Sequence, residues 1–151
     1  MKVLGKRRHM ESVVLESYAT SRQISLIGIH FDKFITEKVY SGLSTYIAIK
    51  GKNNVGGYGL LGTKIGYQQN LTKWLVYNGQ LIIGGAGGGG VPTGGGLVLR
   101  FDSGFGLNLS KSLMLRISAG YLKSFCGGTF KTPLFNIGIS LSSYNLYLPV
   151  K

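Results

Sequence analysis

The segment from Gly84 to Gly96, GGAGGGGVPTGGG, is the first candidate for chemistry, because nine of its thirteen residues are glycine. Glycine-rich loops can cradle a phosphate with their backbone amides, but they then lead into Lys and Ser or Thr at the start of a helix. Here no Lys follows the tract, and a strand-like run does. The similar GYGLLGTK (Gly57–Lys64) ends with those two residues in the wrong order. We therefore predict no nucleotide site, but a mobile loop between two strands, whose first glycines extend the preceding strand.

The chain offers few residues for acid–base or nucleophilic chemistry. His9 and His30 are its only histidines, and no Ser stands in the strand-turn-helix context of a hydrolase nucleophile. Cys126 is the single cysteine, which excludes an internal disulfide and a Cys-rich zinc site. The sequence thus predicts no catalytic residue, no cofactor and no metal site. An enzyme that modifies lipids with Ser and His stays an alternative.

The charge balance points to an anionic partner. The 151 residues include 17 Lys and Arg against 5 Asp and Glu, for a formal net charge of +12. Such a chain is attracted to nucleic acid or to an anionic lipid surface. Its aromatic residues stand mostly among apolar positions rather than between Lys and Arg, so nucleic acid is not the expected partner. The basic residues near the longer connections are Lys50, Lys52, Lys123 and Lys131.

Alternation of apolar with small or polar residues dominates the rest of the chain. In the clearest run, every second residue from Leu97 to Leu109 is Leu or Phe except Ser103, and the residues between them are small or polar except Val98. A period of two is the signature of a β-strand with one apolar face. Eight such runs occur, and no helical pattern is stronger. One of them, Ile24–Phe31, reads as a strand by composition, but its pattern does not show which face is apolar.

The connections between these runs alternate in length. Short polar turns are expected at Thr36–Lys38, Asn70–Lys73 and Ser110–Ser112, and longer loops at Lys50–Gly57, Gly84–Gly96 and Ser124–Thr132. Short turns on one rim and longer loops on the other are typical of an up-and-down barrel in a membrane, and strands of about ten residues suffice for a tilted crossing. Both ends of the chain are then expected at the short-turn rim.

The composition of the non-apolar face decides between a soluble barrel and a membrane barrel. A soluble barrel turns its apolar face inward, whereas a membrane barrel turns it to lipid. The non-apolar face here is rich in Gly, which suits a narrow lumen filled with side chains better than a surface in water. Its few charges have both signs and could pair in a closed lumen; they are Glu16, Lys64, Arg100, Asp102 and Arg116. We expect a diagonal contact of Asp102 with Arg116 across one hairpin.

Two segments resemble the hairpins of small bacterial outer-membrane β-barrel proteins: GTKIGYQQNLTKWLVYNGQLIIGG and GGGLVLRFDSGFGLNLSKSLMLRISAGYLKS. In both, a strand rich in Gly and aromatic residues ends at a short NLT-K or NLS-K turn. The resemblance covers roughly Val13–Leu148 as a pattern, although the final YNLYLPVK lacks the terminal aromatic residue usual in such barrels. It implies localisation in the bacterial outer membrane, contact with the lipid bilayer and with lipopolysaccharide, and a structural, accessory or loop-mediated binding role.

We therefore predict an eight-stranded antiparallel up-and-down β-barrel of the transmembrane type over residues 12–148. The basic segment 1–11 is expected to be disordered or derived from a vector. It lacks the apolar stretch of a secretory signal, so the chain is expected either to have lost its leader or not to be exported. The alternative is a soluble antiparallel barrel that binds an apolar ligand or an anionic polymer.

Overall fold

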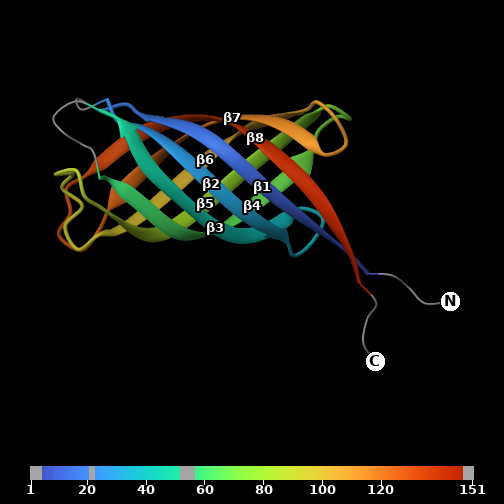
Figure 1. Cartoon of the computed structure of the whole chain (residues 1–151), viewed down its shortest axis with the longest axis horizontal. Helices are drawn as coiled ribbons and strands as arrows, with labels where there is room; N and C mark the ends of the chain where they lie inside the picture. The colour runs from blue at the N-terminus through green and yellow to red at the C-terminus, as the bar shows by residue number, and fades with distance from the viewer. Residues whose placement is uncertain (1–4, 21–22, 52–56, 148–151) are drawn as a thin grey trace.

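Each alternating run of the sequence forms one strand, and each strand pairs antiparallel with the next (Figure 1). The computed structural model describes residues 5–20, 23–51 and 57–147. β1 also pairs with β8, which closes the sheet and confirms the predicted eight-stranded barrel. No helix in the described part of the chain is long and apolar enough to span a membrane. The strands are β1 (Gly5–Tyr18), β2 (Ser25–Phe34), β3 (Val39–Lys50), β4 (Gly59–Asn70), β5 (Leu75–Gly87), β6 (Leu97–Asn108), β7 (Leu113–Ser124) and β8 (Lys131–Tyr147).

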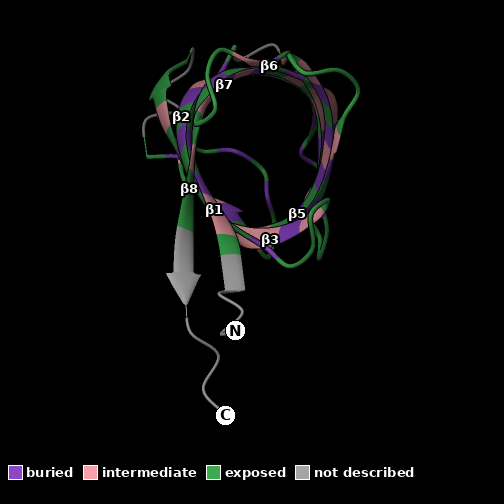
Figure 2. Ribbon diagram, turned by 90° about the vertical axis from the view of Figure 1, so that its right-hand side faces the viewer, coloured by how far each residue is buried: buried purple, intermediate pink, exposed green. Residues whose placement is uncertain are grey.

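Most exposed residues of the strands are apolar and face outward, whereas the lumen holds small and polar residues together with two apolar clusters. Figure 2 colours the ribbon by the burial of each residue. Along β8, Phe135, Ile137 and Ile139 are 60%, 48% and 51% exposed, while the residues between them are buried. A soluble barrel would have the opposite arrangement, so this distribution is that of a membrane barrel and the soluble alternative is wrong. β2, whose apolar face the sequence left open, also turns its isoleucines outward, and its buried residues include His30 and Asp32.

Glycine makes room for large side chains in this narrow lumen. A Cβ atom on Gly66 would lie 2.1 Å from Cζ of Tyr40, and one on Gly28 would lie 2.5 Å from Cδ1 of Tyr46. Both tyrosines are almost fully buried inside the barrel. The glycines on the lumen face therefore serve the packing of a filled interior, as expected from their position in the pattern.

The three short turns share one hydrogen-bonding pattern. In each turn the hydroxyl oxygen of Thr36, Thr72 or Ser110 accepts hydrogen bonds from the backbone amides two and three residues further on. Hydroxyl side chains satisfy backbone amides that the sheet leaves unpaired, which explains why Leu or Ile followed by Thr or Ser begins every one of these turns. The turns lie at the same rim as the start of β1 and the end of β8, at the right of Figure 1.

The glycine tract is part strand and part packed loop. Residues 84–87 belong to β5 and pair with β4, as expected from the sequence. Residues 88–96 form the loop, in which Val91 is buried against the side chains of the lumen. The carbonyl of Pro92 accepts a hydrogen bond from the amide of Phe130, so this loop is docked on the loop between β7 and β8. The greater mobility expected for the tract stays a prediction, although hydrogen bonds join this loop to the neighbouring one.

β1 and β8 continue beyond the short-turn rim as a two-stranded ribbon (Figure 1). Pairing of β1 with β8 begins at Gly5 and Tyr147, whereas pairing of β1 with β2 begins only at His9 and Lys33. The expected start of the barrel domain at residue 12 is therefore wrong, because β8 is long enough to order the basic segment from Gly5 onward. The expected end of the domain at residue 148 lies outside the described residues.

Candidate functional site

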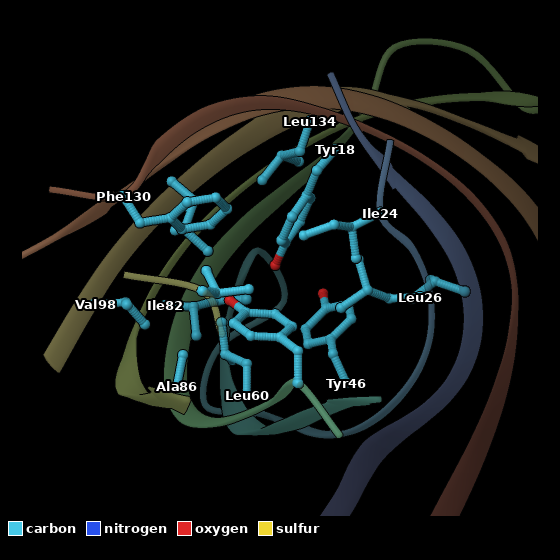
Figure 3. Packing of buried hydrophobic residues seen from close by; sticks show 14 residues of the cluster. Tyr18, Ile24, Leu26, Tyr46, Leu60, Ile82, Ala86, Val98, Phe130 and Leu134 are labelled. Atoms are coloured by element: carbon cyan, nitrogen blue, oxygen red, sulfur yellow. The ribbon is translucent and has the colours of Figure 1, made fainter. Parts of the chain in front are cut away.

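The polar side chains of the lumen form a layer between two apolar clusters. The larger cluster fills the long-loop half of the barrel and includes Tyr18, Tyr46, Phe130 and Leu134 (Figure 3). The smaller cluster lies at the short-turn end and consists of Met10, Phe34, Tyr40, Val76 and Met114. The strand register places the charged residues between these clusters, so apolar side chains separate them from water at both mouths.

Arg100 is the centre of this ionic layer. Its Nη1 donates to Oε1 of Glu16 at 2.8 Å, its Nη2 lies 2.5 Å from Oε2 of Glu16, and its Nε donates to Oδ2 of Asp102 at 2.9 Å. The guanidinium carbon also lies 4.5 Å from the centroid of the Tyr46 ring. Two parallel donors of the planar guanidinium, Nη1 and Nη2, match the carboxylate of Glu16, while Nε is left to bind Asp102. One cation therefore holds two carboxylates from different strands.

Lys64 forms the second ion pair of the layer. Its Nζ lies 2.8 Å from Oδ2 of Asp32, and both side chains are fully buried. The same Nζ lies 2.8 Å from Nδ1 of His30 and 3.3 Å from Oε1 of Gln80. An ammonium group only donates, so Nδ1 of His30 accepts and Nε2 carries the proton toward the hydroxyl of Tyr46, 2.7 Å away. Both ring nitrogens of His30 are thus engaged within the layer.

Arg116 does not form the expected contact with Asp102. Its Nη2 donates to Oδ1 of Asn78 at 2.5 Å, and that oxygen also accepts a hydrogen bond from the hydroxyl of Tyr40. Arg116 does lie opposite Gly106, as the expected register requires. The partner was wrong because residues two apart on a strand share a face, which lets Asp102 reach Arg100 on its own strand.

The structure places all five predicted lumen residues inside the barrel and at most 5% exposed: Glu16, Lys64, Arg100, Asp102 and Arg116. Sequence reasoning missed Asp32 and His30, because the inward face of their strand could not be assigned. Outward placement of Ile27, Ile29 and Phe31 would have been the signal. Asp32 completes the charge balance of the layer, since three carboxylates now face Lys64, Arg100 and Arg116. The neutral members Asn78 and Gln80, which bridge the ion pairs, had also not been singled out.

The lysines predicted near the longer loops lie on the outside of the barrel. Lys50, Lys123 and Lys131 are exposed, and Lys52 lies outside the described residues. Lys123 of β7 stands directly opposite Lys131 of β8, and Nζ of Lys123 lies 5.6 Å from the centroid of the Phe125 ring. The connecting segments at this rim, 19–24, 51–58, 88–96 and 125–130, contain no Asp or Glu. The rim therefore carries positive charge without a compensating carboxylate.

Solved structures match this fold, although no protein-family model and no curated protein matches the sequence. The N-terminal β-barrel domain of OprF from Pseudomonas aeruginosa has a TM-score of 0.67 at 10% identity, over 90% of this chain and 97% of that one. The outer membrane protein Ail of Yersinia pestis, in a phospholipid bilayer nanodisc, has a TM-score of 0.60 at 10% identity, over 90% and 99%. Neisserial surface protein A has a TM-score of 0.60 at 12% identity, over 91% and 98%.

The fold and the lipid-facing wall define the class: a small eight-stranded transmembrane β-barrel of the outer-membrane type. This is the class suggested by the two hairpin segments, and it supports localisation in the bacterial outer membrane with contact to the lipid bilayer. At these identities the likeness concerns the fold.

Proposed function

We propose that this chain is a closed, non-conducting outer-membrane barrel that acts through its long-loop rim, where it binds the anionic lipopolysaccharide of the outer leaflet. The observation that carries the proposal is the separation of charge along the barrel. The chain has five carboxylates: three lie in the ionic layer of the lumen, and the other two, Glu11 and Glu37, lie in the short-turn half. The lysines of the long-loop rim thus have to find their counterions outside the chain.

The filled lumen argues against a pore. Eight strands leave room only for side chains, and here ion pairs occupy the middle while apolar clusters occupy both ends. An ion crossing this lumen would have to displace Arg100 from two carboxylates and pass the tyrosines of the larger cluster. A role in diffusion of solutes therefore fits the geometry poorly.

An enzymatic role also fits the geometry poorly. A general base must reach its substrate, but His30 is 1% exposed and both of its ring nitrogens are engaged by Tyr46 and Lys64. Ser12 lies directly opposite His30 across β1 and β2, but its hydroxyl is hydrogen-bonded to that of Ser140, while the ring nitrogens of His30 are engaged by Tyr46 and Lys64. We therefore propose a binding role and not catalysis of lipid modification.

Polyanion recognition has a parallel among the structural neighbours. Ail of Yersinia pestis has been solved in complex with the heparin analogue sucrose octasulfate, and that structure has a TM-score of 0.53 to this chain at 8% identity. The parallel concerns only the kind of ligand that a small barrel can hold. In this chain the exposed lysines Lys50, Lys123 and Lys131 would supply the cationic groups.

Binding of fluorescent lipopolysaccharide to the refolded chain in phosphatidylcholine nanodiscs tests the proposal. We expect binding above that of empty nanodiscs, and a fall in affinity with rising salt, because exposed charges are screened. Replacing Lys50, Lys123 and Lys131 by Gln should weaken binding, whereas the Lys73→Gln, Lys111→Gln double variant at the opposite rim should not. Binding equal to that of empty nanodiscs, or binding insensitive to salt, would refute the proposed role. The same sample in a planar bilayer should show no channel conductance.

A further inference from the structure

Lys123 and Lys131 form a like-charged pair on the outer wall of the barrel. They are direct cross-strand neighbours on β7 and β8, and both are exposed. Like charges directly opposite one another destabilise a sheet unless something offsets their repulsion. The neighbours in register on the outer wall are Leu99, Tyr121 and Pro133, and no carboxylate stands within cross-strand reach. An anion that contacts both ammonium groups would offset the repulsion.

A depression of about 440 Å³ lies in the lipid-facing wall and is lined by residues of β7, β8, β1, β2 and β3. Its lining includes the outward side chains of Ser17, Ser25, Ile117, Phe135 and Ile137. The two serines face each other across β1 and β2, and the register of β2 with β3 shifts at Ser25. Short side chains at an irregular point of the wall leave a hollow where neighbouring positions carry Ile, Leu or Phe.

The lysine pair and the depression stand in line along β8. Phe135 follows Lys131 by four residues, which is about 13 Å along a strand. Only Pro133 and its cross-strand partner Tyr121 lie between them on the outer wall. A phosphate at the level of the lysines would therefore have the hollow below it, toward the middle of the membrane. This is the arrangement of headgroup and acyl chain in a lipid.

We propose that Lys123, Lys131 and the depression together bind one phosphorylated lipid of the outer leaflet. One phosphate contacts the ammonium groups of both lysines, and one acyl chain fills the hollow lined by Ser17, Ser25 and Phe135. The ring of Phe125 beside Lys123 holds that ammonium group at the interface. This inference rests on the proposed function in one respect only: it takes the long-loop rim to face the outer leaflet.

Native mass spectrometry of the full chain in detergent micelles, titrated with bis-phosphorylated lipid A, tests the site. The Lys123→Gln, Lys131→Gln variant should bind the first lipid about 30-fold more weakly, since each lysine near an anionic lipid surface contributes a factor of about five to six and the two factors multiply. The matched control, Lys73→Gln with Lys111→Gln, removes the same charge at the opposite rim and should bind as the unchanged chain does. Equal losses in both double variants, or no loss in the first, would overturn the site.

The acyl-chain part of the site has its own test. Ser17→Phe fills the hollow, and the cross-strand neighbours of Ser17 are Ser25 and Phe135 rather than a lysine. This variant should weaken lipid A binding, whereas Thr63→Phe, at an exposed position on β4, should not. Lipid A without its phosphates should bind weakly to every form, and inorganic phosphate should compete poorly because it lacks the chain. Strong competition by inorganic phosphate would mean that the lysines bind phosphate alone and would overturn the lipid site. Heat-modifiable gel mobility shows that each variant has folded.

The outcomes separate the two proposals. If lipopolysaccharide binds the unchanged chain in nanodiscs with the expected salt dependence, but the Lys123 and Lys131 variant binds lipid A normally, this site is wrong and the role of the rim stands. If the Lys123 and Lys131 variant loses lipid A binding in micelles as expected, but the unchanged chain in nanodiscs does not bind lipopolysaccharide, the lipid site stands and the proposed role of the rim fails.

Discussion

Removal of Arg100 should destabilise the barrel more than any other single change in the lumen. Arg100→Met keeps a long unbranched side chain but leaves Glu16 and Asp102 buried without their shared cation. Removing one partner of a buried ion pair typically costs about 3–5 kcal/mol, because the remaining charge is neither hydrated nor paired. We expect a loss in this range, and at its upper end, since two carboxylates are affected.

Two further variants give this prediction its control. Arg116→Met removes another buried guanidinium, whose hydrogen-bonding partners in the layer include the neutral Asn78. Its loss should cost about 1.5–3 kcal/mol, the usual contribution of a hydrogen bond to a charged group. The triple variant Glu16→Gln, Arg100→Met, Asp102→Asn should be more stable than Arg100→Met alone, because the two carboxylates that Arg100 neutralised no longer carry charge.

Urea unfolding in lipid vesicles, followed by the fluorescence of Trp74, measures these free energies. A loss of no more than the ~0–1 kcal/mol typical of a solvent-exposed ion pair for Arg100→Met would mean that the lumen is hydrated and would contradict this prediction. Additive effects of the three substitutions would also contradict it, since additivity would mean that Arg100 and the carboxylates do not interact.

Further predictions concern the packing of the lumen and the orientation of the barrel. Gly66→Val should cost about 1–3 kcal/mol in the same unfolding assay because its side chain meets Tyr40, whereas Gly85→Val, where a Cβ meets nothing within 4 Å, should be close to neutral. Trp74, exposed in a short turn, should be quenched more strongly by lipids brominated near the headgroup than by lipids brominated near the chain end, and the reverse order would place that rim inside the hydrocarbon. Cys126, exposed in a long loop, should react with a membrane-impermeant maleimide on intact cells that display the barrel; labelling only after the outer membrane is broken would reverse the topology.

The direction in which most strand residues point could be predicted from the sequence alone. Alternation along β4, β6, β7 and β8 places each residue on one of two faces, and glycine at inward positions identifies a narrow filled lumen. The five lumen charges singled out from the pattern all lie inside the barrel. These conclusions depend only on the period of two, which the backbone geometry of a strand imposes locally.

The contacts between those residues could not be predicted in the same way. Whether Asp102 contacts Arg100 or Arg116 depends on the length and conformation of the two arginine side chains. The alternation along one strand does not show these. Asp32 and His30 were missed because apolar residues stand on both faces of their segment, so its alternation has no clear parity. The early start of β1 depends on the length of β8, about 130 residues further along the chain. The docking of the glycine tract likewise depends on a distant loop.

Two properties define this barrel: its apolar face is turned to lipid, and its lumen is dry and filled with side chains. Paramagnetic relaxation of isoleucine δ1-methyl groups in nanodiscs tests both properties on the unmodified chain. A nitroxide on the lipid acyl chains should broaden the outward methyls of Ile137 and Ile139 strongly and those of the buried Ile24 and Ile82 weakly, and a water-soluble gadolinium chelate should leave all four nearly unaffected. Stronger broadening of Ile24 and Ile82 than of Ile137 and Ile139 by the lipid nitroxide would contradict the outward apolar face, and broadening of Ile82 by the gadolinium chelate would contradict the sealed lumen.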